Sequence, residues 1–230
     1  MVVARGAGRD GLRPMIKRVL RRAGIELDHR SRKLVSWLRP YQPMGQGQSL
    51  LDAQYASAEW DYLRSIEEAP RFGIVSAYCR LLATNGALLE VGCGEGFLLE
   101  QLDRSRYRHF TGIDISEVAI QRARALEDDR TVFVRAEAED YTPDRTFEVI
   151  VFNEVLEYFD EPLELVRRYE PFLAPGGHFV ASMFAAPVTS RSQRIWKRLE
   201  SRYEVAAHSR VRIGRDYQWN VKVLRVPPSA

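Results

Sequence analysis

Cysteine is scarce in this chain, and long apolar runs and low-complexity segments are absent from it. Only Cys79 and Cys93 occur among the 230 residues, too few for a disulfide framework, so we expect a reducing, cytoplasmic compartment. No apolar run approaches the roughly 18 residues that a membrane-spanning helix needs. The basic N-terminus is not followed by an uninterrupted apolar segment, so we expect no secretory signal. At 45% hydrophobic residues, the chain can bury a large core.

Charge is unevenly distributed along the chain. The net charge is +3, but residues 1–40 alone carry eleven Lys/Arg against three acids, and the remainder is net negative. A second basic stretch, residues 191–225, has ten Lys/Arg against three acids. Basic segments around an acidic middle favour contact with an anionic surface or substrate. Solvated, arginine-rich faces are the alternative explanation.

The composition divides the chain into an arm and a domain. Residues 1–49 form a basic N-terminal arm that ends in a Pro/Gly-rich linker over 40–49. Within the arm, residues 14–23 predict a short basic amphipathic helix. It could lie on an acidic membrane surface or dock on the protein itself. Residues 50–226 are expected to form the folded domain.

A glycine-rich turn is the most informative motif. An apolar run over 87–91 leads into Gly92, Gly94 and Gly96, and a second apolar run ends in Asp114. Glycines allow a tight turn after a strand with no Cβ in the way of a ligand. A carboxylate at the end of the next strand can bind both hydroxyls of a ribose. The glycine-rich turn and Asp114 together predict a nucleoside site in a doubly wound α/β sheet.

The glycine spacing indicates which nucleoside derivative is bound. Dinucleotide folds use G-x-G-x-x-G around a pyrophosphate, whereas this turn is G-x-G-x-G, includes Glu95 and follows Glu90. No Lys or Arg occurs from 81 to 103, which suits a cofactor without phosphate. The motif resembles that of the class I S-adenosylmethionine-dependent methyltransferases. An NAD-dependent oxidoreductase, which would have its third glycine one residue later, is the distant alternative.

This resemblance covers about residues 50–226 and implies a fold. That fold is Rossmann-like α/β, with a seven-stranded, mostly parallel sheet, an antiparallel last strand and here an N-terminal helical extension. Apolar patterns predict the strands near 87–91, 109–113, 131–135, 147–152, 177–184, 204–213 and 217–226. They predict the helices near 51–66, 71–82, 96–104, 116–126, 161–173 and 190–202.

The resemblance also implies the residues that bind S-adenosylmethionine. Glu137 stands where the family has an acid that accepts a hydrogen bond from the adenine amino group, although a solvated acidic loop is the alternative. Tyr55 and Trp60 precede the core where a helix often covers the cofactor, and ordinary packing is their alternative role. The expected cofactor-binding residues are Glu90, Gly92, Cys93, Gly94, Gly96, Asp114, Ile115, Glu137, Ala138 and Asn153.

The turn after the fourth strand supplies the candidate catalytic residues, Glu154, Glu157 and Tyr158. Ligands in open α/β sheets bind beyond the carboxyl ends of the strands. The segment resembles an E-x-x-E-H stretch that holds a metal in some methyltransferases, but Tyr158 replaces the histidine. We therefore expect no metal, and Mg²⁺ held by the two carboxylates and water is the minor alternative. A base or substrate-orienting role is favoured, and a helix-start acid pair is the structural alternative. Among the histidines, only His208 is expected near the acceptor.

We therefore expect methyl transfer to oxygen or nitrogen of a small-molecule or saccharide-like acceptor, one that the basic segments suit if it is anionic. Nucleic acid is not expected, because no Asn/Asp-Pro-Pro-aromatic motif occurs. The basic arm could add a peripheral membrane contact. A methyltransferase fold used only for binding or as a scaffold is the alternative from another class. The sequence does not predict the oligomeric state.

Overall fold

The computed structural model of the chain describes residues 47–185, 190–214 and 217–228. The basic helix expected over 14–23 lies outside these ranges, as does most of the arm. Helix α3 begins at Gly47, so the last residues of the expected linker are helical. No helix within the described ranges is long and apolar enough to cross a membrane.

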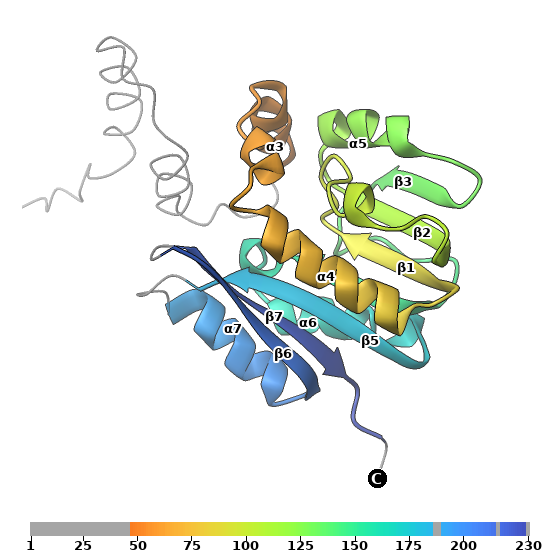
Figure 1. Cartoon of the computed structure of the whole chain (residues 1–230), viewed down its shortest axis with the longest axis vertical. Coiled ribbons are helices and arrows are strands. Elements are labelled where there is room, and N and C mark those ends of the chain that lie inside the picture. Colours follow the sequence, from red (N-terminus) through yellow and green to blue (C-terminus); the bar gives the residue numbers. More distant parts are fainter. Residues whose placement is uncertain (1–46, 186–189, 215–216, 229–230) are drawn as a thin grey trace, which may run out of the picture. The chain divides into compact units, whose positions relative to one another are not determined.

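A single seven-stranded sheet forms the centre of the domain, in the order β3-β2-β1-β4-β5-β7-β6. Strands β1 to β5 pair in parallel, whereas β7 is antiparallel to both β5 and β6 (Figure 1). The predicted strands and the predicted antiparallel closure are confirmed. The strands are β1 (Gly86–Val91), β2 (Tyr107–Asp114), β3 (Thr131–Arg135), β4 (Phe147–Asn153), β5 (Leu173–Phe184), β6 (Glu204–Ile213) and β7 (Tyr217–Arg225).

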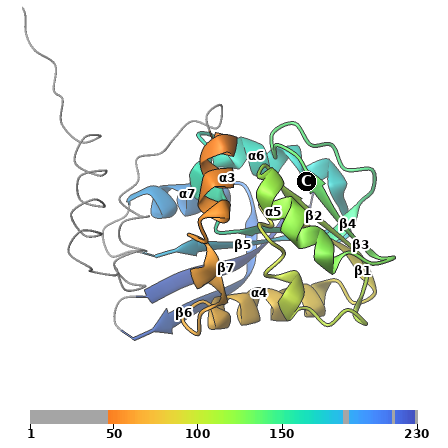
Figure 2. The same cartoon turned by 90° about the horizontal axis from the view of Figure 1, so that it is seen from above.

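Helices cover both faces of this sheet. Side chains of α4 and α5 join one buried cluster and those of α6 and α7 the other, and Figure 2 shows α4 on the opposite side of the sheet from α6 and α7. Strands β1 and β4 are buried along almost their whole length, as a parallel sheet covered on both faces requires. The α-helices are α3 (Gly47–Ala56), α4 (Ala69–Leu82), α5 (Glu117–Ala123), α6 (Pro162–Arg168) and α7 (Ser190–Glu200).

The prediction of a helix over 96–104 is wrong. The chain there forms turns and a short 3-10 helix, η3 (Leu99–Gln101). Phe97, Leu98 and Leu99 are all buried, and three consecutive inward-facing side chains do not fit the single apolar stripe of a surface α-helix. The helix expected over 51–66 is likewise divided, into α3 and the 3-10 helix η2 (Asp61–Arg64).

Candidate active site

The carboxyl ends of β1, β2 and β4 meet at one edge of the sheet, and the glycine loop after β1 lies there. Gly92, Gly94 and Gly96 have φ angles of +75°, +54° and +84°, which L side chains rarely adopt. A Cβ at Gly92 would lie 2.5 Å from Val155 Cγ2, and one at Gly94 would lie 2.8 Å from the Tyr55 hydroxyl oxygen. Both distances are too short for van der Waals contact, so the path of the loop depends on glycine.

Asp114 ends β2 and joins the glycine loop to the start of α5. Its Oδ2 accepts a hydrogen bond from the Gly94 backbone N–H at 2.9 Å, and its Oδ1 accepts one from Ser116 at 2.9 Å. Burial raises the pKa of Asp114, and these hydrogen bonds oppose the rise. Each carboxylate oxygen has a further lone pair, so the fixed carboxylate retains acceptor capacity for hydroxyl donors.

Glu95, the acid inside the glycine loop, is engaged by the protein itself. It is 6% exposed and pairs with Arg64 at 3.0 Å and Arg122 at 2.5 Å. Arg122 also donates to the carbonyl oxygen of Tyr55 at 3.0 Å. Cations from η2 and α5 thus neutralise Glu95, so the loop is less acidic in the folded protein than its own sequence indicates. They lie outside the stretch of sequence that contains no Lys or Arg.

A buried polar network lies where β1, β4 and β5 end. Glu68 and Arg71 are each 1% exposed and form an ion pair at 2.9 Å. Arg71 also donates to Asn153 Oδ1, which accepts a second hydrogen bond from Ser182 Oγ at 2.7 Å. Burial raises the pKa of Glu90 well above its usual value. A hydrogen bond with Asn153 and the positive charge of Arg71 lower this pKa in part. The network thus joins two predicted residues, Glu90 and Asn153, to α4.

Glu68 and Arg71 are the site residues that the sequence analysis missed. They are three apart at the start of α4, a spacing at which side chains meet on one helix face. Arg71 directly precedes Phe72, which belongs to the core together with Val75 of the same helix. A charged pair beside the apolar face of a helix is a usable signal, because a buried charge needs a partner.

Helix α3 brings its aromatic side chain to the glycine loop, as expected. Tyr55 is 6% exposed, and its ring stacks on Trp60 with 5.7 Å between centroids. Asp52 holds α3 against α5, since its Oδ1 accepts hydrogen bonds from Ser116 Oγ at 2.6 Å and from the Val118 N–H at 3.3 Å. The helix therefore covers the edge where the cofactor-binding residues were predicted.

The candidate catalytic residues follow β4, but not on one face of an α-helix. Glu154 has a left-handed backbone, with φ of +61°, and its N–H donates to the Ser182 carbonyl oxygen at 3.1 Å. A 3-10 helix, η5 (Leu156–Tyr158), begins only after it. Glu154 and Glu157 would share a helix face only if a helix began at once, and the left-handed backbone at Glu154 prevents this.

Glu157 nevertheless lies within electrostatic reach of Glu154. Burial, followed by the charge of Glu154, raises the pKa of Glu157 to about 7, and the positive charge of Arg191 lowers it. Arg191 donates to the carbonyl oxygens of Glu157 at 3.0 Å and Phe159 at 2.6 Å. Tyr158 is 45% exposed beside it. A carboxylate that titrates near neutral pH can serve as a general base.

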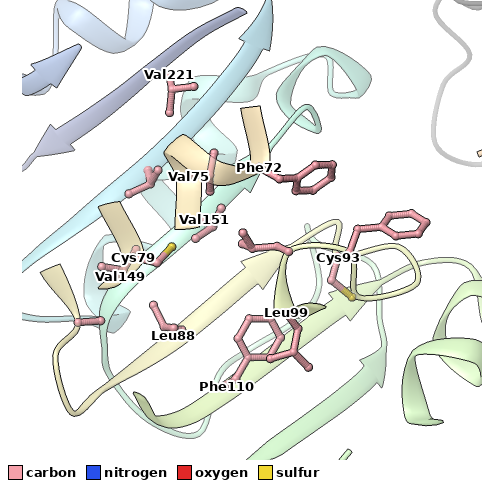
Figure 3. Close-up of a cluster of buried hydrophobic side chains, with 14 of the residues drawn as sticks. Phe72, Val75, Cys79, Leu88, Cys93, Leu99, Phe110, Val149, Val151 and Val221 are labelled. Atoms are coloured by element: carbon pink, nitrogen blue, oxygen red, sulfur yellow. The ribbon is translucent and has the colours of Figure 1, made fainter. Parts of the chain in front are cut away.

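The remaining predicted cofactor-binding residues differ in how far their side chains are buried. The Cys93 side chain points into the core beside Phe110 and Leu99 (Figure 3), and burial raises its pKa, so only its backbone belongs to the loop surface. Ile115 is 7% and Ala138 8% exposed. Glu137 is half-buried in the turn that follows β3.

His208 lies away from this edge. It is exposed in the middle of β6, opposite Lys222, and its Nε2 hydrogen-bonds Asn220 Oδ1 at 3.0 Å. The expected approach of His208 to the acceptor is therefore wrong. In the described ranges, no three His, Cys, Asp or Glu side chains are grouped so that they could hold a metal ion.

Comparison with known families agrees with this geometry. Residues 62–222 match the profile of a family described as a methyltransferase domain. The chain belongs to this family, within the class I S-adenosylmethionine-dependent methyltransferases. The predicted family and Rossmann-like fold are confirmed, and the NAD-dependent alternative is set aside.

Two curated relatives illustrate the family. The chain is 31% identical over 96 residues to the ubiquinone biosynthesis O-methyltransferase of Vibrio parahaemolyticus, covering 40% of each chain. It is 32% identical over 109 residues to the 27-O-demethylrifamycin SV methyltransferase of Amycolatopsis mediterranei, covering 45% of this chain and 40% of that one. The match thus spans less than half the length of these relatives.

Solved structures share the fold over a larger part of the chain. The N-methyltransferase NodS of Bradyrhizobium japonicum, in complex with S-adenosylhomocysteine, superposes with a TM-score of 0.67 at 21% identity, covering 78% of this chain and 98% of that one. The 1,6-didemethyltoxoflavin-N1-methyltransferase of Burkholderia thailandensis gives 0.64 at 17% identity, covering 82% and 92%.

Proposed function

We propose that this protein transfers the methyl group of S-adenosylmethionine to an oxygen or nitrogen atom of a small-molecule acceptor. The observation that carries the proposal is the buried Asp114 carboxylate fixed between the Gly94 and Ser116 amides at the end of β2. The names of the relatives and structural neighbours support both kinds of acceptor atom, since they include O-methyltransferases and N-methyltransferases.

The residues at the sheet edge fit the cofactor. Asp114 has acceptor capacity for ribose hydroxyls, and the glycine loop leaves no Cβ in the way of a ligand. Glu90 Oε2 is buried and lacks a hydrogen-bond partner among the described residues, which suits a cationic amino group. In this proposal, Glu137 accepts a hydrogen bond from the adenine amino group. The cofactor supplies a methyl group already activated by its sulfonium, so the protein has to supply alignment and electrostatics.

We assign the acceptor side to the turn after β4. In this proposal, Glu157 withdraws a proton from a hydroxyl acceptor, because its pKa of about 7 matches the range in which a base is effective. Glu154 and Tyr158 orient the acceptor beside it. An amine acceptor that is already neutral needs only this positioning. No step of this account uses a metal ion.

The acceptor and the arm can be specified further as part of the proposal. We propose residues 50–226 as the catalytic domain and an anionic, saccharide-like compound as acceptor, because residues 191–225 are strongly basic. Residues 1–49 would then act as an arm that draws the protein to anionic partners, acidic membrane surfaces included. Nucleic acid is not part of the proposal.

Calorimetric titration tests the cofactor assignment. S-adenosylmethionine and S-adenosylhomocysteine should bind in the micromolar range, about −8 kcal/mol, whereas NAD should not bind. A protein that binds neither sulfur compound would be a scaffold and not an enzyme. Turnover of an identified acceptor should also persist in EDTA. Turnover that EDTA abolishes and Mg²⁺ restores would instead indicate that Glu154 and Glu157 hold a metal ion.

A further inference from the structure

Helix α7 presents two cations that the described part of the protein does not neutralise. Arg191 donates to backbone carbonyls of the η5 turn, and Arg198 pairs with Glu161 at 2.6 Å. Arg194 and Lys197 are exposed and form no ion pair with any described residue. Their charge is therefore available to a partner.

Strand β6 adds two more cations on the same side of the sheet. Arg210 and Arg212 alternate with the buried Val211, so they point to the face opposite the core that Val211 joins. That face is the one α7 covers, since Lys222 of β7 lies over the Trp196 ring of α7 at 4.6 Å. Arg210 is opposite Asn220, which in turn is opposite Met183, one residue before the end of β5. The two arginines therefore lie toward the carboxyl edge.

Exposed apolar side chains occur at the same edge. Ile66 is 82% exposed and shortly precedes the start of α4, where Arg71 contacts Asn153. Tyr158, 45% exposed, follows β4 in the turn that Arg191 holds. Apolar side chains that stand beside exposed cations at one edge combine the two features by which a protein surface binds anionic lipids.

We propose that this edge docks on a bilayer that contains anionic lipids, with the mouth of the active site facing the bilayer. The docking surface consists of the basic rim, Arg194, Lys197, Arg210 and Arg212, together with Ile66 and Tyr158. Its cations come from two separate elements, α7 and β6, and a layer of anionic headgroups can contact both at once. Cations attract anionic lipids, and apolar side chains enter the headgroup boundary. The inference depends neither on methyl transfer nor on the arm.

A fluorescent label tests the apolar part of this surface in the full chain. Cys79 and Cys93 are both buried, so an environment-sensitive thiol dye will label an introduced Ile66→Cys selectively. Its emission should shift to the blue with phosphatidylglycerol-containing vesicles and stay unchanged with phosphatidylcholine alone. Leu81→Cys is the matched control, because Leu81 is 67% exposed near the other end of α4. No shift at position 66, or equal shifts at both positions, would overturn the proposal.

Charge reversal tests the basic rim. Each cation near an anionic surface contributes about 1 kcal/mol, about fivefold in partition, so Arg194→Glu with Lys197→Glu should weaken co-sedimentation with anionic vesicles at least 25-fold. The control, Arg106→Glu with Arg108→Glu, changes the charge equally at the amino-terminal end of β2 and should have little effect. Equal losses in both variants, or none in the rim variant, would contradict a localised docking surface.

Discussion

The cofactor side and the acceptor side of the site are built in different ways. On the cofactor side, backbone geometry dominates: three glycines with positive φ angles and a carboxylate that binds two backbone amides. On the acceptor side, a side chain from a distant segment holds the turn: Arg191 donates to the Glu157 carbonyl oxygen, 34 residues away. The comparison teaches that the residues proposed for the cofactor are held mainly by main-chain geometry, and the turn proposed for the acceptor by a side chain from a distant helix.

The largest effect is expected on the acceptor side. Glu157→Gln removes the proposed base and should lower turnover of a hydroxyl acceptor by about 10²–10⁴-fold, while cofactor affinity stays unchanged. Glu161→Gln is the matched control, because Glu161 is a 61% exposed partner of Arg198. Steady-state kinetics with calorimetry on both variants measures the separation. Full activity in Glu157→Gln would remove the base from the mechanism.

Arg71→Met should destabilise the domain by about 3–5 kcal/mol, because it leaves Glu68 buried without its partner. The same change at Arg106, whose ion pair with Asp103 is 54% exposed on both sides, should leave the free energy of unfolding almost unchanged. Urea unfolding gives both free energies. Equal values would mean that the buried Glu68–Arg71 pair contributes no more to the stability of the domain than an exposed pair does.

Two glycine substitutions separate backbone strain from loop packing. Gly94→Ala and Gly176→Ala both place a side chain at positive φ, which costs about 1–2 kcal/mol. A Cβ at Gly176 has no atom within 4 Å, whereas one at Gly94 collides with the Tyr55 hydroxyl. Both variants should therefore lose stability in thermal unfolding, but only Gly94→Ala should bind S-adenosylhomocysteine more weakly. Weaker binding in both would point to strain alone.

The smallest effect is a displacement of the pH–rate profile. Turnover should rise with pH through about 7, as Glu157 loses its proton. Glu154→Gln removes a negative neighbour, so the pKa of Glu157 falls and the acid limb of the profile moves to lower pH. Arg191→Gln removes a positive neighbour and should move the limb to higher pH. Shifts in one common direction would contradict this electrostatic assignment.

The cofactor side was predictable because its determinants are local. Gly92, Gly94 and Asp114 perform backbone roles that short motifs record, and strand periodicity placed the sheet around them. The error over residues 96–104 arose where an apolar pattern fits both an amphipathic helix and a buried turn, and only packing against the core decides between them.

The acceptor side was predictable only in part, because its geometry depends on contacts between segments that are far apart in the sequence. The sequence pointed to Glu154 and Glu157 but could not give the left-handed backbone at Glu154, which tertiary contact with Ser182 maintains. Arg191, which holds this turn, and on the cofactor side the partners of Glu95 and Asn153, come from segments that become neighbours only when the chain folds. Long-range pairing of this kind leaves no local periodicity to recognise.

One pair of titrations tests most directly whether the two sides are separate. S-adenosylhomocysteine is titrated into Asp114→Asn, which keeps the side-chain volume and one oxygen acceptor, and into Glu157→Gln. Loss of a charge-assisted hydrogen bond, worth about 1.5–3 kcal/mol, should weaken binding to Asp114→Asn at least tenfold, with thermal unfolding showing that the fold survives. Glu157→Gln should bind like the unmodified protein. Unchanged affinity in Asp114→Asn, or equal losses in both variants, would contradict the account.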